Sequence, residues 1–483
     1  MPDLNEENVR HLLRRTEVVD RPERVAELLA LGSISQAVDD VMAIDANPPS
    51  ASFSGVDADS NWRLGIRLSE HWMDQMASAA RPFGERMAFF WHGHICSELG
   101  KVGSAIEMRR QIDLFRSTGV NGNISTLMKT MAIQVAMLKY LDNDQNRASS
   151  PNQNFARELM ELFLLGVGNY TEADVEAATA AWTGHGRPRW DVDTYRFDPD
   201  QHENAPQQFL GRTVNNGSPA QGGNQTIDVI LGNGIVPAGA EINRGAATRD
   251  VAADFLSKKL WQEFGEAASR GVPSGVAGAM RSALVGSNFG IRPWVAAMLN
   301  HDDFYSAATK GGLVRQPIDY VVALLVATGL RAEDGAQTWL MERTGQRPLY
   351  PPNVSGWKPN GYWVNASAMG ARQEMANGLQ WRLQRDTWEG ENGYMDIGRD
   401  SVRITKTEVN GLWKNGTYTE PMPRDQLVDR LTLGLQLNVT SDVRTRILDH
   451  LAYLDSRPVD DVGPWQRLDA LFLLLSAPEM HIA

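Results

Sequence analysis

Residues 151–184 read PNQNFARELMELFLLGVGNYTEADVEAATAAWTG, and this stretch decides the fold class. GVGNY predicts a helix end and a turn, and Thr171 predicts the N-cap of a second, Ala-rich helix that stops at Gly184. Two successive helices joined by a short turn favour a helical protein. The first helix has apolar residues at offsets 0, 4, 7 and 8, the spacing of one helical face: Phe155, Leu159, Leu162 and Phe163.

The rest of the chain has a similar pattern. Helical spacing of apolar residues dominates, and few segments alternate with period two. We therefore expect a mainly α protein, a multi-helix globular bundle with long irregular loops rich in Gly, Pro and Asn. The pattern divides the chain into a helical part at 1–184, an irregular loop region at 185–249 with a short helix at QTIDVIL, and a helical part at 250–483.

The composition argues against several functional classes. Lys and Arg number 47 against 59 Asp and Glu, and the formal net charge of −12 argues against a general nucleic-acid binder. The single cysteine, Cys96, rules out an intrachain disulfide framework and any multi-cysteine metal site. No run of about 18 uncharged apolar residues occurs, which predicts no membrane span. Residues 1–15 lack the apolar core of a secretory signal, so we expect a cytoplasmic location.

The segment FWHGH at residues 90–94 is the first candidate for chemistry. His92 and His94 each offer an imidazole, a common ligand of transition metals. In an extended chain the two rings point to the same side and can share one ion, whereas on a helix they lie about 200° apart and cannot. The alternative is that one ring packs against Trp91 and bonds a carbonyl while the other is solvated.

A polar stripe lies opposite the apolar face of the helix predicted at 151–166. Carboxylates on inward stripes of helical bundles can bind metal ions. The alternative is a solvated face that carries an ordinary ion pair between Arg157 and Glu161, which are four residues apart. If the stripe is buried, its two carboxylates and one arginine need a cation or further donors. Its members are Asn154, Arg157, Glu158 and Glu161.

His202 lies in the loop RFDPDQHENAPQQFLG among acidic residues. It is a candidate general base or third metal ligand, and a surface turn is the alternative.

A second loop, PPNVSGWKPNGYW at 351–363, is stiff and rich in aromatic residues. Its side chains Trp357, Tyr362 and Trp363 either cover a pocket, face a partner, or form a structural plug over helix ends.

Several of these segments occur in an order that resembles the bacterial domain-of-unknown-function 1800 family. The resemblance runs from about residue 7 to the C-terminus, so the three parts of the chain are expected to form one family domain. Besides residues 151–184, the segments that carry it are HLLRRTEVVDRPERVAELL, FWHGH, AMLKYLDN, RFDPDQHENAPQQFLG, AADFLSKKLW, PPNVSGWKPNGYW and LLLSAPEM.

The resemblance implies a largely helical protein. Many members are exported and occur beside a sulfatase-like family, which implies a sulfatase-like partner protein. The chain departs from the family pattern at His185 and at Glu203–Ala205, next to the His202 loop. By similarity, the motif positions fall on His92, His94, Asn154, Arg157, Glu158, Glu161, His202, Trp357 and Trp363.

Two functions are compatible with these patterns. The first is a metal-dependent enzyme, or a metal-binding accessory to one, that uses zinc, manganese or iron. Asn154 and Arg157 would hold the carboxylates behind the ligands. The second is a non-catalytic helical scaffold that docks a partner through the loop around Trp357. No nucleotide cofactor is expected, because the phosphate-binding and dinucleotide motifs are missing. The metal ligands of the first function would be His92, His94, Glu158, Glu161 and His202.

Overall fold

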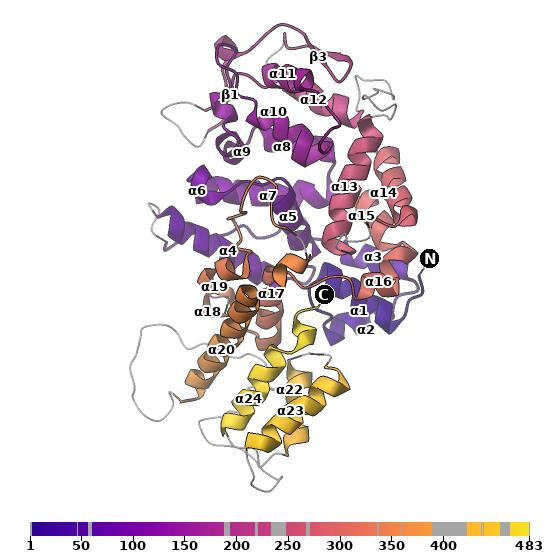
Figure 1. Cartoon of the computed structure of the whole chain (residues 1–483), viewed down its shortest axis with the longest axis vertical. Coiled ribbons are helices and arrows are strands. Elements are labelled where there is room, and N and C mark those ends of the chain that lie inside the picture. The colour runs from indigo at the N-terminus through magenta and orange to yellow at the C-terminus, as the bar shows by residue number, and fades with distance from the viewer. Residues whose placement is uncertain are drawn as a thin grey trace.

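The computed structural model confirms a mainly α protein with only two short hairpins in its described part. Figure 1 shows an elongated molecule with α8–α12 towards one end, α22–α24 at the other, and most remaining helices between them. The structure describes residues 2–45, 47–56, 60–187, 194–217, 221–232, 248–266, 271–335, 338–358, 360–388, 423–435, 437, 439–454 and 464–482.

Six helices of the first half begin at Asn, Ser or Thr side chains that cap free backbone N–H groups. They are α1 (Glu6–Thr16), α2 (Pro22–Leu29), α3 (Ile34–Val41), α4 (Asn61–Ser78), α5 (Phe83–His94), α6 (Leu99–Val102), α7 (Ala105–Asn121), α8 (Ile124–Ala132), α9 (Val135–Tyr140), η1 (Asn143–Gln145), α10 (Asn154–Glu158), η2 (Leu159–Leu164) and α11 (Glu172–Ala181).

The second half begins with the hairpins and continues as helices. Its elements are β1 (His185–Gly186), β2 (Arg196–Phe197), η3 (Pro199–Gln201), β3 (Gln207–Phe209), β4 (Arg212–Val214), α12 (Gln221–Leu231), α13 (Thr248–Phe264), α14 (Ser274–Gly286), α15 (Ile291–Leu299), η4 (Asp302–Tyr305), α16 (Ala307–Lys310), α17 (Pro317–Thr328), α18 (Ala332–Gly335), α19 (Thr338–Thr344), η5 (Asn360–Trp363), α20 (Ala366–Trp388), α22 (Arg424–Gly434), α23 (Ser441–Leu454), α24 (Pro464–Leu475) and η7 (Pro478–Met480).

The region predicted as irregular, 185–249, contains two antiparallel pairs, β1 with β2 and β3 with β4. Helix α12 covers the QTIDVIL segment. Three pieces of this region, 188–193, 218–220 and 233–247, lie outside the described residues.

The helix predicted after Pro151 is present, but its second half is a π-helix and not an α-helix. It starts as α10 and continues from Leu159 as a π-helix, η2. The amide of Leu165 bonds the carbonyl of Met160, five residues earlier, at 2.8 Å. This wider turn leaves Leu162 only half-buried, while Leu159 is fully buried. π-Helical turns are rare and often occur at functional sites.

The second helix of the stretch is confirmed as α11. Thr171 is its N-cap, and a capping box joins the side chain and backbone of Thr171 to Asp174. The capping box satisfies two backbone donors at the start of the helix.

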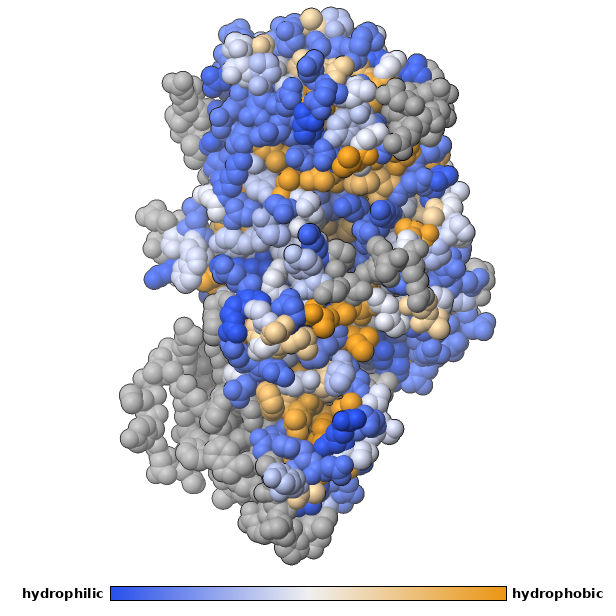
Figure 2. Space-filling view, viewed as in Figure 1, coloured by the Kyte–Doolittle hydropathy of each residue, from blue (hydrophilic) through white to orange (hydrophobic). Residues whose placement is uncertain are grey.

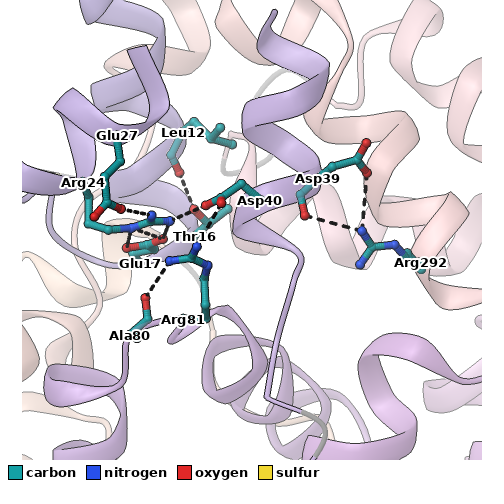
Figure 3. A network of polar contacts seen from close by, with 10 residues as sticks. All are labelled: Leu12, Thr16, Glu17, Arg24, Glu27, Asp39, Asp40, Ala80, Arg81 and Arg292. Atoms are coloured by element: carbon teal, nitrogen blue, oxygen red, sulfur yellow. Dashed lines mark hydrogen bonds and ion pairs between the residues drawn. The ribbon is translucent and has the colours of Figure 1, made fainter. Parts of the chain in front are cut away.

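A buried ion-pair network joins the first three helices (Figure 3). Arg24 bonds Glu17 at 2.7 Å and Asp40 at 2.9 Å, and Arg81 bonds the second oxygen of Asp40 at 2.9 Å. Glu17 is fully buried, so its charge depends on Arg24 for compensation. The network therefore fixes α1, α2 and α3 to the segment after α4.

The end of the described chain returns to the middle of the molecule, near the start of α17 (Figure 1). Ile482 forms an antiparallel bridge with Val314, and the amide of Arg315 bonds the carbonyl of His481 at 2.8 Å. The buried Arg315 side chain also donates to the carbonyl of Met480 at 3.1 Å. The last residues thus complete the packing of the central helices.

The visible surface is hydrophilic over most of its area, with hydrophobic residues in limited patches (Figure 2). Within the described ranges, no helix combines the length and the apolarity that a membrane span requires. The apolar side chains are instead buried inside, where six tryptophans are almost fully enclosed: Trp72, Trp91, Trp182, Trp261, Trp294 and Trp363.

Candidate active site

The FWHGH segment and the aromatic loop meet at two glycines. FWHGH forms the last turns of α5, and the loop runs across it. A Cβ atom on Gly356 would lie 2.0 Å from the carbonyl oxygen of Gly93. Gly356 also has a φ of +75°, which a side chain disfavours. Only glycine at 356 therefore lets the loop approach the helix this closely. One residue further on, Trp357 stacks on Phe89 with ring centres 5.3 Å apart.

His92 holds this loop in place. Its ring is fully buried beside Trp72 and Trp357, and its Nε2 accepts a hydrogen bond from the amide of Leu349 at 3.2 Å. Burial lowers the pKa of His92 to about 3, so the ring is neutral. The proton consequently resides on Nδ1, which has no hydrogen-bond partner among the described residues.

His94 contacts the signature stretch through the backbone. Its Nε2 lies 2.9 Å from the carbonyl oxygen of Phe163, in the π-helical turn, and its ring stacks on Phe90. Burial, together with the positive charge of Lys259, lowers the pKa of His94 to about 3. The ring is therefore neutral, Nε2–H donates to the carbonyl, and Nδ1 keeps the lone pair. The two motifs meet through this bond and not through a carboxylate.

The polar stripe of α10 and η2 has partners of its own. Arg157 makes a bidentate pair with Glu172, with both bonds at 2.8 Å, and not with Glu161. Glu161 instead accepts a hydrogen bond from the hydroxyl of Tyr170. The π-helical turn begins between positions 157 and 161, so the α-helical spacing used to predict their pairing does not hold.

The other two members of the stripe also lie at the surface or near it. Asn154 is exposed and donates to Asp142 at 3.4 Å. Glu158 is half-buried, and its pKa is raised by burial and by the nearby charge of Glu161. This carboxyl therefore takes up protons more readily than an exposed one.

His202 is buried, and both of its ring nitrogens face backbone carbonyls. Nδ1 lies 2.8 Å from the oxygen of Thr183, and Nε2 lies 3.0 Å from that of Asn216. The alternative of a surface turn is therefore not what the structure shows, because the buried His202 contacts both the end of α11 at Thr183 and the segment after β4 at Asn216. Neither ring nitrogen is left to ligate an ion.

These placements do not assemble the expected metal centre. His92 and His94 lie on a helix and contact different neighbours, so they cannot share an ion. Across the part of the chain that the structure describes, no three His, Cys, Asp or Glu side chains are arranged to hold a metal. Within the described residues, the structure therefore does not bring the predicted ligands His92, His94, Glu158, Glu161 and His202 together around one ion. Asn154 and Arg157, predicted to hold the carboxylates, bond Asp142 and Glu172 instead.

A different site lies beside FWHGH. We call it the central pocket, and its volume is about 100 Å³. Trp357 and Trp363 line it, whereas Tyr362 is not among the lining residues and is 59% exposed. The pocket lies between α5, α13, the start of α17 and the aromatic loop. Its lining residues are Phe89, Phe90, Gly93, His94, Lys259, Gln262, Glu263, Gln316, Gln346, Ser355, Trp357 and Trp363.

The charged groups of the central pocket were not predicted from the sequence. Lys259 and Glu263 lie one turn apart on α13, with Gln262 between them. Burial lowers the pKa of Lys259 and raises the pKa of Glu263. The available signal was a polar stripe at 259, 262 and 263 beside the apolar Leu260, Trp261 and Phe264, which on most helices is a solvated face.

Glu263 connects the central pocket to a buried ion pair. Its carboxylate lies 3.6 Å from the guanidinium of Arg86, which bonds Asp319 at 2.6 Å. The charge of Arg86 favours ionised Glu263, while burial and the charge of Asp319 disfavour it, and burial is the largest influence. Such opposed influences on one pocket carboxyl are typical of active sites.

With this geometry described, the chain can be compared with known proteins. The family model described as "Protein of unknown function (DUF1800)" matches residues 11–482, nearly the whole chain, as the motifs suggested. No curated protein and no solved structure matches the chain. The chemistry of the site must therefore be inferred from its own residues.

Proposed function

Because the chain belongs to the DUF1800 family of proteins of unknown function, we propose its activity from the central pocket: an enzyme that binds a small organic molecule there and donates a proton to it from Glu263. The observation that carries the proposal is a buried carboxyl with a raised pKa in an aromatic-walled pocket. Concave sites in which polar groups converge beside aromatic side chains are typical of small-molecule binding.

A chain of amides orients Glu263. The backbone amide of Ile318 donates to Gln346 Oε1 at 3.0 Å, which fixes the orientation of that side-chain amide. Gln346 Nε2 then donates to Gln316 Oε1 at 2.6 Å, and Gln316 Nε2 donates to Glu263 Oε1. A backbone N–H can only donate, so the direction of the whole chain is set. Oε1 of Glu263 is thereby an acceptor, so in the protonated form of Glu263 the proton is carried by Oε2.

The raised pKa favours the protonated form of Glu263, which is the form that can donate a proton. A carboxyl that keeps its proton closer to neutral pH serves as a general acid, as long as it reaches the ligand. The side chain retains 19% of its exposure although it lies on a packed helix, and it lines the pocket. Its proton is therefore available to a molecule bound there.

His94 has a different role from Glu263. Its ring is neutral and its Nδ1 carries the lone pair, because Nε2–H is bonded to Phe163. With a pKa of about 3 it is a weak base, so it orients a donor group of the ligand without taking up the proton. Glu263 and His94 thus supply one donor and one acceptor to the same pocket.

Infrared difference spectroscopy tests the proposal directly. The spectrum of the full chain, after subtraction of the spectrum of its Glu263→Gln variant, should show the C=O band of a protonated carboxylic acid. This band should disappear at a higher pH than the band of ordinary glutamates. Glu161→Gln, on the surface stripe, is the matched control and should leave that band unchanged. A Glu263 that titrates like an exposed glutamate would remove the proposed proton donor.

A further inference from the structure

We infer that the central pocket selects a small aromatic monocarboxylate, with the carboxylate on Lys259 and the ring between the aromatic walls. This inference rests on the proposed function, since it names the class of molecule that Glu263 would act on. Three observations support it: Lys259 has no carboxylate partner within the described residues, the walls are aromatic, and the carboxyl of Glu263 lies one turn further along α13.

Lys259 has no carboxylate partner within the described residues. Other lysines of the chain do have one: Lys101 bonds Asp142 at 2.8 Å, Lys129 bonds Asp228 at 2.6 Å, and Lys310 bonds Glu7 at 2.7 Å. Because Lys259 is half-buried, water compensates its charge less than that of an exposed lysine. An unpaired cation in a pocket is a site for an anion.

The groups around Lys259 are neutral. Its Nζ lies 5.4 Å from the centre of the Phe255 ring, and His94 carries no charge. Burial raises the pKa of the Cys96 thiol to about 12, so that neighbour is uncharged as well. The other charge that acts on Lys259 is that of Lys258, which is a cation and exposed. This end of the pocket is therefore net positive.

The Glu263 side of the pocket limits the ligand to one negative charge. Glu263 lies 3.6 Å from the guanidinium of Arg86, whereas Lys259, one turn earlier on α13, lies against the ring of Phe255. A second negative charge on the ligand would lie near the carboxyls of Glu263 and Asp319, and Arg86 already pairs with both of them. A monoanion matches Lys259, the lysine among the lining residues of the pocket.

The walls favour a flat apolar body. Trp357 is stacked on Phe89 with the planes within 10°, and Phe90 and Trp363 complete the lining. Offset stacking between rings adds to the burial of apolar surface. An aromatic carboxylate satisfies both the walls and Lys259.

The test compares three probes on the full chain by saturation-transfer NMR and calorimetric titration: benzoate, its neutral isostere benzamide, and phenyl phosphate as a dianion. A charge-assisted hydrogen bond predicts about tenfold tighter binding of benzoate than of benzamide. Lys259→Gln should abolish this preference and Lys259→Arg should retain it. Lys258→Gln, one residue away and exposed, is the matched control and should bind like the parent.

Each outcome has a definite meaning. Equal binding of benzoate and benzamide overturns the role of Lys259 and leaves the proposed function standing, since the infrared band of Glu263 is measured separately. Tighter binding of phenyl phosphate overturns the choice of a monoanion. Loss of the preference in Lys258→Gln, or binding of no probe to a folded chain, overturns the inference. Circular dichroism of each variant shows whether it is folded.

Discussion

The close approach of Gly356 to Gly93 gives a quantitative prediction. In a Gly356→Ala variant, the new Cβ would start 2.0 Å from a backbone oxygen, whereas ordinary contact begins at 3.4 Å. Neither backbone atom can move away by a side-chain rotation. The aromatic loop must therefore lift from α5.

The cost has separable parts. A side chain in the left-handed region costs about 1–2 kcal/mol. Lifting the loop also weakens the Trp357–Phe89 stacking, at about 0.5–1.5 kcal/mol, and the hydrogen bond from Leu349 to His92, at about 1 kcal/mol. We expect Gly356→Ala to lower the free energy of unfolding by about 2–5 kcal/mol.

Gly103 provides the matched control. Its φ is +67°, close to that of Gly356, but a Cβ there would meet nothing within 4 Å. Gly103→Ala should cost only the backbone part, about 1–2 kcal/mol. Calorimetric melting of both variants measures the difference. If the two melting temperatures fall equally, the close contact between loop and helix does not exist as described.

Further predictions concern the rest of the molecule. Arg24→Met leaves Glu17 buried without a counter-charge and should cost about 3–5 kcal/mol, most of it recovered when Glu17→Gln is added; a double variant as unstable as the single one contradicts this. The pKa of His92 is lowered to about 3, so between pH 6.5 and 3 the folded protein binds fewer protons than the unfolded chain. Stability should therefore fall as the pH falls, by up to ~1.4 kcal/mol per unit for this group, and His92→Phe should show a shallower slope in melts at several pH values. Arg157→Ala breaks an exposed pair with Glu172 and should leave both the melting temperature and benzoate binding nearly unchanged. A loss of benzoate binding in this variant would show that the polar stripe takes part in the site.

The sequence predicted the elements better than their chemistry. Thr171 and the apolar spacing around Phe155 were sufficient to place two helices, because caps and periodicity are local properties. The π-helical turn at Leu159 was not predictable, since it depends on tertiary packing and shifts Glu161 away from Arg157. The predicted metal ligands do not come together among the described residues, and short spacings cannot report which carbonyls the imidazoles already bond.

The central pocket was predicted only in part. Trp357 and Trp363 stood out because large aromatic residues are rare in loops, and both line it. Lys259 and Glu263 did not stand out, because a lysine and a glutamate four residues apart on a helix are ordinary at a surface. Their importance comes from α5 and the aromatic loop covering that face, which only the folded chain brings about.

The return of the last residues to the middle of the molecule affects how the chain matures during synthesis. Arg315 can donate a hydrogen bond to the Met480 carbonyl, and Arg372 to the ring of His481, only when translation has passed residue 481. A nascent chain that stalls earlier carries these buried guanidinium groups without those acceptors. Chains truncated before residue 480 should thus be more sensitive to proteases than chains that include residues 480 and 481.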